Sequence, residues 1–258
     1  MIRLRTETQP GHGSRPEPRD RPCCYGIAGS TVETSSPEVA FEGLEIPCDT
    51  QEDRQPMPRR RSAAPGTEEQ VIFEGDVELG GGVRRGRTVR RGETVRFEVE
   101  TLGDVTIAAG VSSCEVQVRP YPGVARGSRG WQELVAGPAL TLPLTLDGVV
   151  CLHASGVLAP AGAVAFFGSS GQGKSTLAVG LGAELPRIAD DILPLARVTK
   201  TSRAGFVALP RFPQLKLPPA QRVSPDLPPR LPVAALFELE TLPGEERLAS
   251  LSVEPLPP

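Results

Sequence analysis

The segment Gly168–Ser175 reads GSSGQGKS and fits the phosphate-binding pattern G-x-x-x-x-G-K-[ST]. It contains Lys174, one of only three lysines in a chain that otherwise uses arginine as its basic residue. Glycines let such a loop turn its N–H groups toward phosphate oxygens, and a helix start adds its positive dipole end. A lysine ammonium can reach the β- and γ-phosphates as a compact charge, and a serine hydroxyl can bind Mg²⁺. The pattern therefore predicts that Lys174 and Ser175 bind a nucleoside triphosphate.

We expect the whole loop and the start of the following helix to contact the nucleotide. A glycine-rich turn without a ligand is the alternative interpretation. The loop, however, stands between an apolar strand and a helix start, which is the context that phosphate binding requires. The residues expected to bind the nucleotide are Gly168, Ser169, Ser170, Gly171, Gln172, Gly173, Lys174, Ser175 and Thr176.

Two adjacent carboxylates, Asp190 and Asp191, follow Lys174 at the end of a short apolar stretch. Adjacent aspartates in a loop are more often merely solvated. Next to a phosphate-binding loop they can divide two tasks, because one can hold Mg²⁺ while the other accepts a proton from an attacking hydroxyl. The residue types alone do not indicate which aspartate has which task.

The elements that position these residues follow from the apolar pattern. We expect a strand at Val149–His153, a second strand at Ala163–Phe167 and a helix at Lys174–Ala183 that begins in the loop. After Pro186 the sequence RIADDILPL predicts a short buried strand that ends at the aspartates. Residues 131–146 are compatible with a helix, which two prolines weaken.

Upstream, residues 70–119 alternate Val, Ile and Phe with polar residues between Gly/Arg turns, which predicts an antiparallel meander. Residues 1–69 are polar and rich in proline, and we expect them to be largely disordered or poorly structured. The expected organisation is therefore a poorly structured segment at 1–69, a small β-rich segment at 70–130, and a P-loop domain at 131–258.

The composition excludes several classes of partner. The 258 residues carry a net charge of −3, so nucleic acid and acidic membranes are not expected partners. No apolar run approaches the roughly 20 residues of a membrane span, and the N-terminal residues lack the apolar stretch of a secretory signal. Five cysteines without CxxC spacing and only two histidines argue against a zinc site. We therefore expect a cytoplasmic protein.

Three motifs together indicate a family. His153, the loop GSSGQGKS and the ADD motif at Ala189–Asp191 stand in the order, and near the spacing, of the HPr kinase/phosphorylase family, which the chain resembles. The pattern LHASGV…GKSTL…ADD…FPQLKL is still more similar to the smaller HPr-kinase-like proteins, some of which phosphorylate a peptide serine. The resemblance covers residues 152–195, with a weaker tail to 217. It implies an α/β fold, with a P-loop domain of the HPr-kinase/PEP-carboxykinase-like type and a β-rich N-terminal part.

The resemblance also implies roles. Asp190 would be the general base, Asp191 and Ser175 would hold Mg²⁺, and His153 would orient the carboxylates beside the catalytic Lys174. The implied activity is an ATP-dependent serine kinase that uses ATP and Mg²⁺, and its partner would be a hydroxyl of a peptide or protein. The alternative is a P-loop nucleotide-binding protein or an ATPase without kinase activity. The sequence leaves open the acceptor, a phosphorylase activity and a homo-oligomeric state.

Overall fold

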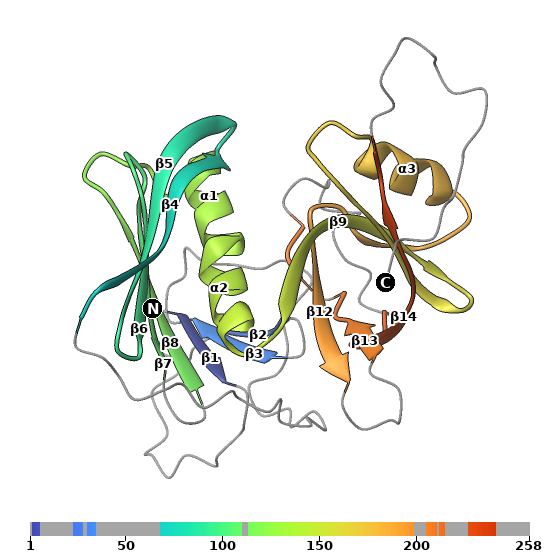
Figure 1. Cartoon of the computed structure of the whole chain (residues 1–258), viewed down its shortest axis with the longest axis horizontal. Coiled ribbons are helices and arrows are strands. Elements are labelled where there is room, and N and C mark those ends of the chain that lie inside the picture. Colours follow the sequence, from blue (N-terminus) through green and yellow to red (C-terminus); the bar gives the residue numbers. More distant parts are fainter. Residues whose placement is uncertain are drawn as a thin grey trace.

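The fold is built mainly from strands. Among the described residues, the computed structural model contains strands β1–β14 and helices α1–α3. The strands form an eight-stranded and a six-stranded sheet. Helices α1 and α2 lie between the two sheets, as Figure 1 shows. The structure describes residues 2–5, 23–27, 30–34, 68–109, 113–198, 205–210, 212–214 and 227–240.

The expected meander is confirmed. Its five strands pair in chain order, and each is antiparallel to the next. The first two strands are joined by Gly80 and Gly81, which both have positive φ (69° and 76°), a conformation that glycine adopts without a steric penalty. The strands are β4 (Gln70–Leu79), β5 (Gly82–Arg91), β6 (Thr94–Val99), β7 (Gly103–Ala109) and β8 (Ser113–Pro120).

Three further strands belong to the segment 1–69 that we expected to be poorly structured. They are β1 (Ile2–Arg5), β2 (Cys23–Ile27) and β3 (Ser30–Thr34). β1 pairs antiparallel with both β8 and β3, so these strands extend the meander to an eight-stranded sheet whose other end is β4. The rest of this segment up to residue 67 lies outside the described residues.

The stretch expected to be one helix forms two. Helix α1 (Arg129–Ala136) begins after Ser128, whose hydroxyl oxygen accepts a hydrogen bond from the N–H of Trp131. Gly137 separates it from α2 (Pro138–Leu146), which starts with the proline that a first helical position favours. Both helices bury apolar side chains in a core shared with the meander.

The six-stranded sheet closes into a small barrel. β10 pairs parallel with β14 and antiparallel with β9, so β10, β14, β13, β12 and β9 form a ring, and β11 pairs with β9 outside it. Small and branched apolar residues fill its interior. The elements are β9 (Val150–Ala159), β10 (Gly162–Phe167), α3 (Lys174–Leu181), β11 (Arg187–Ala189), β12 (Ile192–Val198), β13 (Gly205–Ala208) and β14 (Leu231–Glu238).

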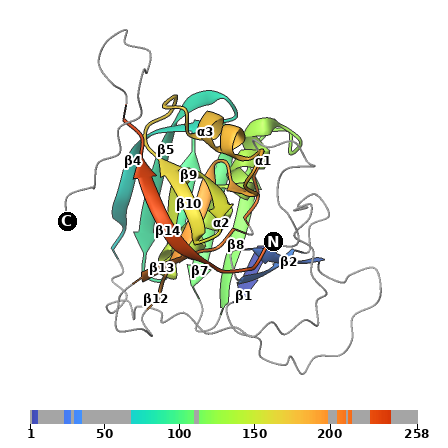
Figure 2. The same cartoon turned by 90° about the vertical axis from the view of Figure 1, so that its right-hand side faces the viewer.

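The predicted fold class is therefore wrong. An α/β P-loop domain would have a mainly parallel sheet covered by helices on its faces. Here β10–β14 is the single parallel pairing among the described strands, and α3 is the one helix that follows a barrel strand in the described part of the chain. The local order of strand, glycine loop and helix is present, but it is attached to a closed, largely antiparallel barrel (Figure 2). No helix of the described residues is long and apolar enough to cross a membrane.

Candidate active site

The glycine-rich loop joins the end of β10 to the start of α3. Gly171 and Gly173 both have φ of 85°, and Gly168 has φ of 141°, so the loop needs glycine at three positions. A Cβ at Gly168 would stand 2.2 Å from the amide oxygen of Gln172, which folds back over it. The first N–H groups of α3 have no partner within the helix, and they therefore form a site for an anion.

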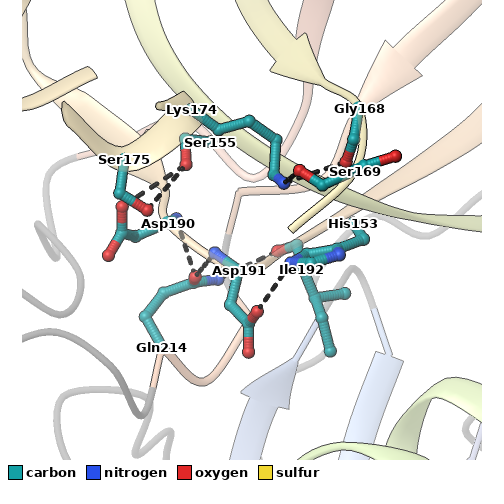
Figure 3. Close-up of polar contacts among 10 residues, drawn as sticks. All are labelled: His153, Ser155, Gly168, Ser169, Lys174, Ser175, Asp190, Asp191, Ile192 and Gln214. Carbon is teal, nitrogen blue, oxygen red and sulfur yellow. Dashed lines mark hydrogen bonds and ion pairs between the residues drawn. The ribbon is translucent and has the colours of Figure 1, made fainter. Parts of the chain in front are cut away.

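Lys174 directs its ammonium back into this loop. Its Nζ donates hydrogen bonds to the carbonyl oxygens of Gly168 (2.9 Å) and Ser169 (2.8 Å), as Figure 3 shows. The residue is 7% exposed, and no ion pair within the described part of the chain involves it. A buried ammonium is costly without a negative partner. It has three N–H donors, so one remains for a ligand in addition to the two carbonyls.

Strand β9 carries a polar row beside the loop. Successive side chains of a strand alternate between its faces, so His153 and Ser155 share one face. Ala154 and Leu152 point the other way, into the barrel core. The Ser155 hydroxyl lies 3.5 Å from the hydroxyl of Ser175 in the first turn of α3. Ser155 of the barrel wall thus lies between the first turn of α3 and the carboxylates.

The two aspartates follow β11 and face different surroundings. Asp190 is buried, and its Oδ1 accepts a hydrogen bond of 3.4 Å from Ser155, the same serine that lies beside Ser175. Asp191 is more exposed, and its Oδ1 lies 3.3 Å from Nε2 of His153. Register explains this second contact, because His153 of β9 stands opposite Ile192, the residue after Asp191.

Gln214 holds the turn that contains both aspartates. Its Oε1 accepts hydrogen bonds from the backbone N–H groups of Asp190 (2.9 Å) and Asp191 (3.1 Å). Its Nε2 donates to the carbonyl oxygens of Ile192 (3.0 Å) and Phe212 (3.1 Å). Gln214 is 1% exposed, so its amide replaces the water that these backbone groups would otherwise need.

A cavity of about 800 Å³ opens beside Asp191 and His153. Its far walls are the β4–β5 hairpin and helices α1 and α2, so it lies between the two sheets. Cys151 also lines it, and burial raises the pKa of this thiol to about 11 despite a hydrogen bond from Thr145 that opposes the shift. The cavity and the glycine-rich loop therefore meet at the aspartate pair, with Asp191 on the cavity side and Asp190 on the loop side.

This arrangement brings together the residues that the sequence singled out for chemistry. His153, Lys174, Ser175 and both aspartates converge around the start of α3 (Figure 3). The geometry favours a different division of tasks from the one that the resemblance implies, because Asp190 rather than Asp191 shares a neighbour with Ser175. Ser155 and Gln214 were not identified from the sequence as site residues. The alternation of β9 indicates Ser155, whereas Gln214 comes from the FPQLKL segment and has no local signal.

The donors fit a magnesium nucleotide. Mg²⁺ in nucleotide sites takes one or two carboxylates and completes its shell with phosphate oxygens and water. Asp190 and Ser175 supply one carboxylate and one hydroxyl on either side of Ser155. The described residues contain no group of three or more His, Cys, Asp or Glu that could hold a metal without such a ligand. Ser169 and Ser170 of the loop and Thr176 of α3 are exposed residues, so the loop is open to solvent.

Comparison with family models, with curated proteins and with solved structures found no match to this chain.

Proposed function

We propose that the protein is an ATP-dependent kinase that transfers the γ-phosphate of Mg-ATP to a hydroxyl, most simply a serine of a peptide or protein. The buried ammonium of Lys174 carries this proposal, since it lies in a glycine loop at a helix start with carbonyl oxygens as its partners. An anion at this position would supply the negative charge that the ammonium lacks. An ATP-dependent reaction also fits the cytoplasmic location expected from the sequence.

The separate positions of the two aspartates support transfer to an acceptor rather than simple nucleotide binding. Asp190 and Ser175 would hold Mg²⁺, which neutralises charge on the phosphate oxygens. Asp191 faces a cavity large enough for a side chain and its neighbours, and His153 lies at hydrogen-bond distance to orient it. Asp191 is therefore the better candidate for the base.

The proposed step needs no further reactant. The acceptor hydroxyl enters the cavity and donates a hydrogen bond to Asp191. Its oxygen forms a bond to the γ-phosphorus, while the bond between that phosphorus and the β–γ bridging oxygen breaks and ADP leaves. The hydroxyl proton passes to Asp191. Lys174 and the N–H groups at the start of α3 hold the phosphates in line and stabilise the charge that develops on them.

The experiment that tests this function is incubation with γ-labelled ATP, Mg²⁺ and a mixture of serine-containing peptides. Label in a peptide that is lost in Lys174→Ala and Asp191→Asn supports the kinase. Free phosphate alone would indicate an ATPase. The absence of both products would indicate a protein that binds nucleotide without turnover. A Lys200→Ala variant, which changes a lysine outside the motif, controls for the loss of a positive charge.

A further inference from the structure

Strand β4 forms a long edge of the eight-stranded sheet. It has ten residues, contains no proline, and pairs with β5 alone among the described strands. Figure 2 shows it at the outer side of its sheet, with β5 next to it. An unpaired edge of this length presents a row of N–H and C=O groups that can pair with another chain.

This edge also exposes apolar side chains that a monomeric surface normally hides. Val71, Ile72 and Phe73 are consecutive on β4 and are 47%, 54% and 40% exposed. Carboxylates further along β4 are partly neutralised, because Arg85 forms ion pairs with both Glu74 and Asp76. The first half of the edge is therefore apolar, with an irregularity of the β4–β5 register between Val71 and Phe73, and an added strand could cover these side chains.

The other end of β4 leads into the cavity at the aspartate pair. Glu78 and Leu79 line the same cavity as His153 and Asp191. Within the described part of the chain, no ion pair or hydrogen bond involves the Glu78 carboxylate. Glu78 and Asp191 thus both line the space where an acceptor would sit, and two acidic residues there favour a positively charged neighbour.

We propose that the acceptor is an extended peptide of about ten residues that adds a strand to β4. Its apolar side chains would cover Val71–Phe73, a lysine or arginine would face Glu78, and the adjacent serine would lie at Asp191. The fate of that serine rests on the proposed function, whereas the docking does not. A second copy of this chain fits the edge less well, because β4 itself carries Glu74, Asp76 and Glu78 and no basic residue.

The test selects peptides on the immobilised full-length protein, without nucleotide, from a display library of random 15-residue peptides that each contain one fixed serine. We expect selected peptides with alternating apolar residues and a basic residue next to the serine. Fluorescein-labelled copies of these peptides should bind Phe73→Lys and Glu78→Lys at least tenfold more weakly. Phe206→Lys is the matched control, since Phe206 is exposed by 45% on β13 in the barrel, and it should bind like the original protein.

Two measurements address the strand pairing itself. An added strand pairs with β4 through the N–H groups of every second peptide residue. N-methylation of that set of residues should abolish binding, whereas N-methylation of the other set should leave binding nearly unchanged. Hydrogen exchange should show β4 protected on binding. Enrichment of no peptide, protection elsewhere, or equal binding by Phe73→Lys would overturn the proposal. A dimer that Phe73→Lys dissociates would assign the edge to a second copy instead.

The failure of the proposed function can be told apart from the failure of this inference. Lys174 is the first residue of α3 and does not line the cavity that Glu78 and Asp191 share, so Lys174→Ala should bind the selected peptides with unchanged affinity. Peptides that bind at β4 and are never phosphorylated would refute the kinase and keep the docking. Peptide phosphorylation at the same rate in the original protein, Phe73→Lys and Glu78→Lys would refute the docking at β4 and keep the kinase.

Discussion

Replacement of Gln214 by methionine should lower the free energy of unfolding far more than the replacement of an exposed glutamine does. Methionine has nearly the same length but neither donates nor accepts strongly, so the four hydrogen bonds of the Gln214 amide are lost together. A buried polar group left without a partner costs about 1–3 kcal/mol. The N–H of Asp190 is buried, whereas Asp191 is more exposed and can recruit water. We therefore expect a loss of roughly 2–4 kcal/mol in the free energy of unfolding.

Equilibrium unfolding in urea measures this loss, with Gln117→Met as the matched control. Gln117 lies on β8 and bonds to Glu115 and Arg119 at the surface, so its replacement should cost less than about 0.5 kcal/mol. A Gln214→Met protein within about 1 kcal/mol of the original would refute the reasoning that this amide holds the aspartate turn. If the protein is the proposed kinase, its phosphoryl transfer should also fall, because the turn positions both carboxylates.

Three other predictions concern the site and its scaffold. Asp191→Asn should leave Mg-ATP affinity nearly unchanged and lower the rate of phosphoryl transfer by about 10²–10⁴-fold. Asp190→Asn should instead weaken Mg²⁺-dependent ATP binding in calorimetry. The opposite pattern would restore the roles implied by the resemblance. Because burial raises the pKa of Cys151 to about 11, its thiol stays protonated at pH 8. Iodoacetamide should therefore label Cys151 on the order of 100-fold more slowly than an exposed cysteine, as followed by peptide mapping. Labelling at the rate of an exposed cysteine would contradict the burial of this thiol. Gly103→Ala brings a Cβ to 2.3 Å from a backbone oxygen and should lower the free energy of unfolding by about 1–3 kcal/mol. Gly127→Ala, which has open space around it, should leave the stability unchanged. Equal stability of the two variants would contradict the close packing at Gly103.

The sequence predicted local elements well because their signals are local. Alternation of apolar residues gave the meander at 70–119, and the glycine pattern between an apolar strand and a helix gave the order of β10, loop and α3. The division at Gly137 was missed, although Gly137 followed by Pro138 is a local signal for the end of one helix and the start of the next.

The fold class could not be predicted in the same way. Alternation identifies a strand but not its partner, and the barrel depends on the pairing of β10 with both β9 and β14. Leu231, where β14 begins, lies far along the chain from β10, so nothing in the local pattern indicates that they pair. The expectation of an α/β fold came from the family resemblance and not from the pattern of the strands.

The candidate site shows the same limit. The glycine loop and the aspartate pair are visible in sequence because each is contiguous. Gln214 joins the site through a side chain that reaches backbone groups more than twenty residues away, and such a contact has no sequence period. The separation of Asp190 from Asp191 depends on which neighbour each carboxylate meets, Ser155 or His153, and this follows only from the register of β9 and β12.

Calorimetric titration with Mg-ATP of the original protein, Lys174→Ala and Lys174→Arg tests whether the glycine-rich loop and Lys174 form a nucleotide site. We expect saturable binding at one site in the original protein, little or no binding by Lys174→Ala, and weakened binding by Lys174→Arg, because the planar guanidinium does not fit where the compact ammonium lies between two carbonyl oxygens. Equal Mg-ATP affinity in the original protein and in Lys174→Ala would contradict the nucleotide site and, with it, the proposed kinase.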